Sequence, residues 1–172
     1  MPWWKRALFD TCSIITLDKI LLDRPRLLSQ FPKTILALDE SFTVEQMRED
    51  TAQRMKSRVT HCPLPPLTDL AAFLTAGALS KALSDVDKLV FATAAHSSLP
   101  VVTADKRLAK AIKKKKMTVG NVAMILKELT IAGKISQRSC ERILLTLAAR
   151  NDFLLGKPSS TWADLADYTF PD

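Results

Sequence analysis

This chain of 172 residues has few of the residues that build disulfide or zinc scaffolds. Its three cysteines, Cys12, Cys62 and Cys140, lie far apart and form no C-x-x-C pair, and it has only two histidines. We therefore expect neither a disulfide framework nor a zinc site. The four glycines follow no regular period, which excludes collagen-like and solenoid repeats.

Long hydrophobic runs are also missing. No apolar stretch reaches the roughly 18 residues that a bilayer-spanning helix needs, and the start of the chain lacks the apolar core of a secretory signal. We therefore expect a cytoplasmic protein with no membrane partner. Lys and Arg number 25 against 18 Asp and Glu, a net charge of +7. This excess favours a polyanionic partner or an anionic surface.

Short apolar runs alternate with amphipathic segments along the chain. Strands are predicted at 6–9, 34–38, 99–103 and 117–119, with at most a short edge strand within the proline-broken stretch 59–67. Helices are predicted at about 14–22, 42–56, 68–81, 84–95, 106–114, 121–132 and 137–149. This order is typical of βαβ crossovers, so we predict an α/β domain with a mainly parallel sheet covered on both faces.

Acidic residues follow the predicted strands directly. Asp10 ends the first strand, Asp39 and Glu40 the second, and Asp105 follows the strand at 99–103. Ligands of such sheets bind beyond the carboxyl ends of the strands. Clustered carboxylates repel one another and raise each other's pKa unless a divalent cation lies among them. Mg²⁺ and Mn²⁺ prefer oxygen ligands and suit phosphodiester hydrolysis.

Each acid also has a purely structural interpretation. Asp105 is placed to cap the helix that begins at Lys106, and Ser84 with Asp87 matches a capping box. Asp10 is harder to explain in this way, because an acid at the end of a buried strand is costly to desolvate without a partner.

Four segments resemble, in order, the PIN domain family of nucleases, which includes the ribonuclease toxins of bacterial toxin–antitoxin pairs. They are Leu8-Phe-Asp10-Thr-Cys-Ser, Ser41-Phe-Thr-Val-Glu45, Asp87-Lys-Leu-Val-Phe-Ala and Val101-Val-Thr103-Ala-Asp105. The resemblance covers about residues 6–120, and the tail from Val119 resembles the helical extension of one prokaryotic subgroup. It implies a three-layer α/β/α fold with strand order 3-2-1-4-5.

The same resemblance implies a site. Its metal-binding acids fall on Asp10, Glu45, Asp87 and Asp105, holding Mg²⁺ or Mn²⁺ for a nuclease that acts on RNA rather than DNA. Small hydroxyl residues beside the metals correspond to Ser13 and Thr103. Asp39 and Glu40 are rivals for Glu45, and Asp85 is a rival for Asp87. We interpret Cys12 as a small buried hydrophobe rather than a nucleophile.

A basic run follows Asp105 without interruption by any acid. Its seven cations are Lys106, Arg107, Lys110, Lys113, Lys114, Lys115 and Lys116. They form either a solvated face or a surface that tracks the phosphates of a nucleic acid.

We expect one PIN-like domain at 1–156, with a core at about 6–120, a helical extension at about 121–156, and an acidic aromatic tail at 157–172. No P-loop, dinucleotide-binding or serine-hydrolase motif is present. The resemblance implies a toxin-type endoribonuclease with an antitoxin-like protein partner and a homodimer. The alternative is a PIN-fold module that binds nucleic acid or a protein partner without cutting.

Overall fold

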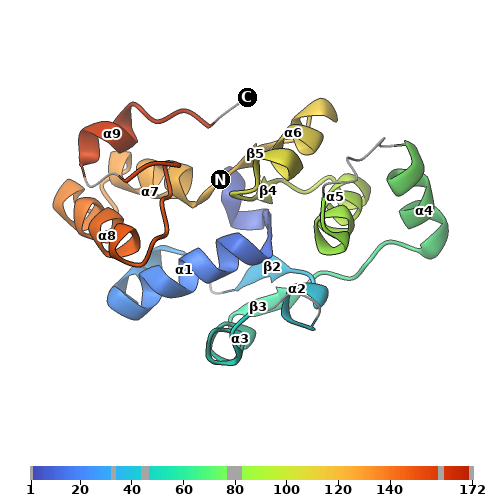
Figure 1. Ribbon diagram of the computed structural model, residues 1–172, viewed down its shortest axis with the longest axis horizontal. Helices are drawn as coiled ribbons and strands as arrows, with labels where there is room; N and C mark the ends of the chain where they lie inside the picture. The colour runs from blue at the N-terminus through green and yellow to red at the C-terminus, as the bar shows by residue number, and fades with distance from the viewer. Residues whose placement is uncertain (1, 32–33, 44–46, 77–82, 159–160, 171–172) are drawn as a thin grey trace.

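The computed structural model describes residues 2–31, 34–43, 47–76, 83–158 and 161–170. Its five strands are β1 (Leu8–Phe9), β2 (Ile35–Ala37), β3 (Val59–His61), β4 (Val101–Val102) and β5 (Val119–Gly120). They form one sheet in the order β3-β2-β1-β4-β5, and all four pairings are parallel (Figure 1). The predicted α/β class, the parallel sheet and the strand order are confirmed.

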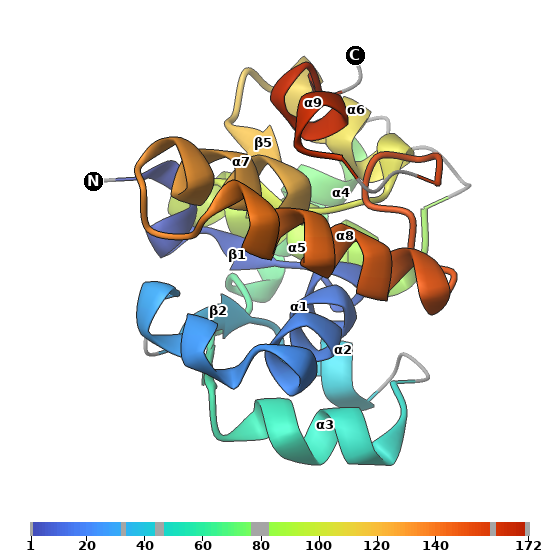
Figure 2. The same ribbon diagram turned by 90° about the vertical axis from the view of Figure 1, so that its left-hand side faces the viewer.

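Helices cover both faces of this sheet. One face carries α1 (Thr11–Asp23), α7 (Val122–Ile131) and α8 (Gln137–Ala149), and the other carries α5 (Asp85–Ser97) and α6 (Lys106–Lys114). In Figure 1 the layers run from α7 and α8 at the left, through the sheet, to α5 and α4 (Leu67–Ala76) at the right. Figure 2 looks at the α8 side of the same arrangement.

Side chains alternate across the central strands, and this alternation fixes the two layers. Leu8 and Val101 are buried with α5 and α6, while their neighbours Phe9 and Val102 are buried with α1, α7 and α8. Because parallel strands buried on both faces read as continuous apolar runs, the runs at 6–9 and 99–103 indicated the correct strands.

The structure does not have the single helix that the sequence predicted at 42–56. The structure has α2 (Glu40–Thr43) and α3 (Glu49–Lys56), with residues 44–46 outside the described part of the chain. Arg48 has an extended backbone, and the Met47 side chain before it is buried in the core on the α1 side. The single helix predicted at 42–56 is therefore wrong, because the chain is not helical at Met47 and Arg48. The predicted helix at 68–81 begins as α4, and its last residues lie outside the described part.

The last described residues pack onto the domain. A short helix, α9 (Trp162–Ala166), is capped by the Thr161 side chain, and Leu165 is fully buried. The Lys127 ammonium of α7 donates to the backbone carbonyls of Ala166 and Tyr168. The segment 161–170 is thus part of the folded body. Among the described residues no helix is both long and apolar enough to cross a membrane.

Candidate functional site

Asp10 is the first residue beyond β1 and the N-cap of α1. Its amide continues the ladder to β4 by donating to the Val102 carbonyl at 3.1 Å. Asp10 is 3% exposed, and its Oδ1 accepts a 2.7 Å hydrogen bond from the Ser13 amide. The same acid therefore ends the strand and starts the helix, which explains why an acid is tolerated at a buried position.

Thr103 connects Asp10 to Asp105 across the edge of the sheet. This fully buried residue follows β4, and its hydroxyl donates to Asp10 Oδ2. The same hydroxyl accepts a 2.9 Å hydrogen bond from the Asp105 amide. Because β1 and β4 are neighbours, residues far apart in the chain meet at one point. Both supporting positions named from the sequence, Ser13 and Thr103, lie against Asp10.

The pKa of Asp10 is raised to about 6, chiefly because burial penalises its charged form. The hydrogen bonds from Thr103 and Ser13 oppose this shift, and the negative charge of Asp87 adds to it. The Ser13 hydroxyl, also beside this carboxyl, forms no hydrogen bond of regular geometry within the described residues. A raised pKa was expected from crowding of like charges, but burial is the larger cause.

The two other acids serve as helix caps. Asp105 Oδ1 accepts from the amides of Arg107 at 2.7 Å and Leu108 at 2.8 Å, so Oδ2 takes no part in the cap. Asp87 and Ser84 form a reciprocal capping box at the start of α5. The structural interpretations of both acids are thus correct, and they leave room for a second role.

The rival acids are placed differently. Asp85 is 90% exposed at its side chain and pairs with Lys88 at 2.7 Å, so it does not face Asp10. Asp39 is exposed and lies 3.4 Å from His61 Nδ1. Glu45 lies outside the described residues. Cys12, expected to be buried, is exposed in the first turn of α1, because the buried face of that helix is taken by Ser13 and Ile14.

No group of three or more His, Cys, Asp and Glu side chains placed to hold a metal ion is found in the described part of the chain. The caps explain this arrangement, since Asp105 and Asp87 each turn one oxygen toward backbone amides. The donor set nevertheless suits a hard cation. Mg²⁺ keeps several waters and is usually bound through only one or two carboxylates, and a cation beside Asp10 would favour its charged form.

The basic run forms α6 and the turn that follows. Leu108, Ala109 and Ile112 are buried, while Lys106, Arg107 and Lys110 are exposed. Lys114, Lys115 and Lys116 are exposed as well, and the half-buried Lys113 places its ammonium 5.2 Å from the centre of the Phe170 ring. The cations therefore cover the outer side of a helix whose first residue directly follows Asp105.

A cavity of about 200 Å³, here called the C-terminal pocket, lies beside this acidic edge. It is lined by Ser13, Thr16, Ala104, Lys106, Ala109, Asn121, Val122, residues 152–156, Tyr168 and Phe170. Ser13 contacts Asp10, and Ala104 lies between Thr103 and Asp105 in the chain. No pattern in the sequence indicated this pocket, because its walls come from segments scattered over most of the chain.

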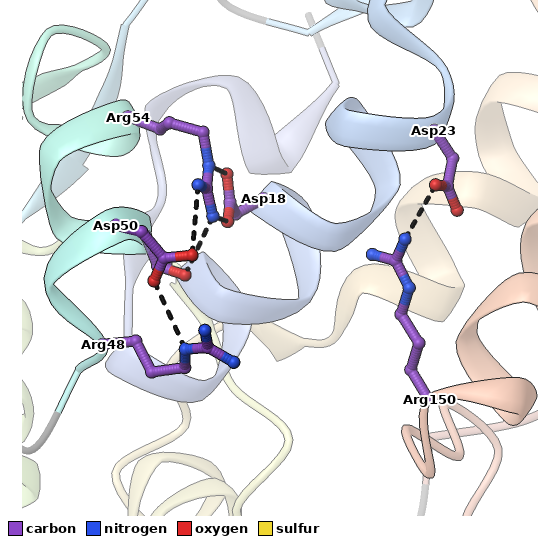
Figure 3. Close-up of polar contacts among 7 residues, drawn as sticks. Asp18, Asp23, Arg48, Asp50, Arg54 and Arg150 are labelled. Carbon is purple, nitrogen blue, oxygen red and sulfur yellow. Dashed lines mark hydrogen bonds and ion pairs between the residues drawn. The ribbon is translucent and has the colours of Figure 1, made fainter.

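A second polar cluster fastens α1 to its neighbours (Figure 3). Asp18 is 3% exposed and accepts two hydrogen bonds from Arg54 of α3, at 3.0 and 2.7 Å. The Asp18 carboxylate holds the pKa of Arg54 above its usual value. Arg150, just after α8, pairs with Asp23 at 2.8 Å. These pairs hold the helix that Asp10 caps, and no motif in the sequence indicated them.

Comparison of the chain with models of protein families and with curated proteins gives no match. The strand order and the arrangement around Asp10 are therefore the observations that bear on function.

Proposed function

We propose that this protein is a metal-dependent nuclease of the PIN-domain type, which hydrolyses phosphodiester bonds in RNA with Mg²⁺ or Mn²⁺. The observation that carries this proposal is the buried Asp10 carboxyl, which is joined through Thr103 to the Asp105 backbone and lies within the electrostatic influence of Asp87. A carboxyl with a raised pKa at the ligand-binding edge of a parallel sheet is a candidate functional group.

In this proposal Asp10, Asp87 and Asp105 hold the ion, with Glu45 as a further acid. A bound divalent ion would activate water and neutralise charge on the phosphate oxygens. Thr103 and the Ser13 amide orient the Asp10 carboxyl through their hydrogen bonds. Asp105 Oδ2, which is free of the helix cap, is the oxygen that this residue can offer. The attacking group is a water molecule, and no side chain acts as the nucleophile.

The cations of α6 supply the contacts to the nucleic acid. Lys106 and Arg107 follow Asp105 directly and are exposed, so a phosphate at the acidic edge lies within reach of positive charge. The choice of RNA, a toxin-type role, an antitoxin-like partner and a homodimer come from the PIN resemblance and form part of the same proposal.

The test compares two acids in matched variants. Purified protein is incubated with single-stranded RNA and DNA in the presence of Mn²⁺ or EDTA, beside the variants Asp105→Asn and Asp85→Asn. Asn caps a helix about as well as Asp, so Asp105→Asn should keep the fold. We expect Mn²⁺-dependent cleavage of RNA that Asp105→Asn reduces by at least about a hundredfold, while Asp85→Asn retains the activity of the parent.

Equal cleavage by the parent and Asp105→Asn would remove the catalytic assignment. RNA binding without cleavage, in Mn²⁺ as in EDTA, would support the alternative of a PIN-fold binding module.

A further inference from the structure

The C-terminal pocket opens beside the proposed cleavage site and is built from groups that suit a nucleobase. Its volume of about 200 Å³ is below the roughly 300–1,000 Å³ of sites for drug-sized ligands, so it admits one small ring system. Phe153, Tyr168 and Phe170 supply aromatic surface to its lining. RNA is read chiefly through unstacked bases that stack on aromatic side chains and bond through their edges.

The aromatic wall is held in place before any ligand arrives. Asn121 Nδ2 donates to the Tyr168 hydroxyl at 2.7 Å, and Lys127 holds the Tyr168 carbonyl at 3.0 Å. Leu165, in the short helix just before Tyr168, is fully buried, and Lys113 lies over the Phe170 ring. Since a preorganised wall costs little ordering on binding, it favours affinity for a stacked ring.

Polar groups also line the pocket. Asp152 Oδ2 accepts from Thr16 at 2.9 Å and from Lys19 at 2.7 Å, which leaves Oδ1 outside both bonds. The buried Ser13 hydroxyl lies beside the Asp10 carboxyl and also lines the pocket. An acceptor and a hydroxyl of this kind match the ring N–H, amino and carbonyl groups on the edge of a base.

The position of the pocket links it to the proposed chemistry. Ser13 donates its amide to Asp10, and Lys106 is the residue after Asp105. A nucleotide whose base fills the pocket therefore has its own phosphate close to the acidic edge and to the Lys106 ammonium.

We propose that the C-terminal pocket binds one unstacked nucleobase of the RNA, next to the phosphodiester bond that is cut. This inference rests on the proposed nuclease function and adds a base-binding subsite to which residues 152–156, Tyr168 and Phe170 contribute half of the lining. The nucleotide in the pocket sets which bond reaches the acids, so the pocket determines the sequence preference of cleavage.

The test uses short single-stranded RNAs in which the fluorescent base 2-aminopurine replaces one base at a time. The full chain is titrated in EDTA, so that binding is measured without cleavage, and fluorescence anisotropy follows the same titration. We expect strong quenching of 2-aminopurine at one position, since stacking on an aromatic ring quenches the probe.

Phe170→Ala should abolish this quenching and weaken RNA binding by about tenfold, with the salt dependence unchanged because the same cations still neutralise the phosphates. Phe170→Trp should restore both, which separates loss of stacking from loss of folding. The matched control is Phe73→Ala, which removes a half-buried aromatic ring from α4, a helix whose residues do not line the pocket. That variant should behave like the parent.

The outcomes separate the two proposals. Tight binding and Mn²⁺-dependent cleavage, with no quenching at any position, would overturn the pocket assignment and leave the nuclease standing. Quenching that survives Phe170→Ala would overturn it as well. Failure to bind or cut any RNA would overturn both proposals.

Discussion

At the scale of the residue, Asp10 combines two demands that usually conflict. It caps α1 and joins β1 to β4 through Thr103, yet its carboxyl is buried and its pKa is raised to about 6. A protein that needed only a helix cap would be more stable with a neutral side chain here. Sites that lower stability in this way are typical of functional positions.

This conflict predicts how metal-free protein responds to pH. The pKa of Asp10 is higher when folded than its ordinary 3.8, so the folded state binds more protons near pH 5. Its contribution to stability is present at low pH and is lost as pH rises through about 6. Relative to Asp10→Asn, we expect the parent to gain about 1–1.5 kcal/mol between about pH 8 and about pH 5. Denaturant unfolding in EDTA measures this difference, and identical pH profiles for the two proteins would contradict it.

Residue patterns predicted some of these roles and not others. The caps at Asp105 and Asp87 were visible because capping is local, decided by residues two or three positions away. The burial of Asp10 was expected from its place after an apolar strand, and the PIN resemblance placed Thr103 at the same site, but the hydrogen bond between them depends on the pairing of β1 with β4, which no local pattern contains. Cys12 was placed wrongly because its exposure depends on which face of α1 meets the sheet.

At the scale of the element, α6 is an amphipathic helix with one apolar face and one cationic face. Its predicted bounds, 106–114, match the structure, because Asp105 caps one end and Leu108 and Ile112 mark the buried face. The predicted bounds of the helix at 137–149 also match the structure, in which Ser136 caps its first turn. The single helix predicted at 42–56 is wrong, since Met47 and Arg48 are not helical and Met47 is buried in the core, which local propensity does not reveal.

The cationic face predicts a change in salt dependence. In the proposed function these lysines contact phosphates rather than bases, so replacing Lys113, Lys114, Lys115 and Lys116 with Ala should weaken RNA binding on every sequence alike. The slope of log affinity against log salt should flatten by about 0.7 for each phosphate of single-stranded RNA that is no longer neutralised. The control removes the same charge elsewhere, by replacing Lys5, Lys56, Arg58 and Lys134 with Ala. Equal slopes for the two variants would make the basic run an ordinary solvated face.

At the scale of the whole molecule, the strand order of the sheet brings together residues that lie far apart in the chain. The alternation of strands and helices predicted a parallel sheet, and the PIN resemblance implied its strand order. The structure has both. The C-terminal pocket did not follow, because Ser13, Ala104, Asn121, Asp152 and Tyr168 meet only once helices from both ends of the chain are docked.

A metal bound at this junction should stabilise the whole fold. At a Mn²⁺ concentration about a hundred times the dissociation constant, binding to the native state alone adds about 2.7 kcal/mol. For a chain of this size the melting temperature should then rise by about 5–10 °C, and EDTA should reverse the rise. Asp10→Asn should lose the shift and Asp85→Asn should keep it. Differential scanning fluorimetry measures these melting temperatures. An equal rise of the melting temperature in Asp10→Asn would place the metal elsewhere.

The central position of β1 has a consequence for how the protein is made. Asp10 and Thr103 are 93 residues apart, and β1 pairs on one side with β2 and on the other with β4. During synthesis the first three strands leave the ribosome while the β4 side of β1 still has no partner. The Asp10 carboxyl then lacks both the Thr103 hydroxyl and the neighbouring Asp105. Under the proposed nuclease function, the chain would therefore stay inactive toward the messenger RNA that encodes it until β4 and the residues after it have been translated.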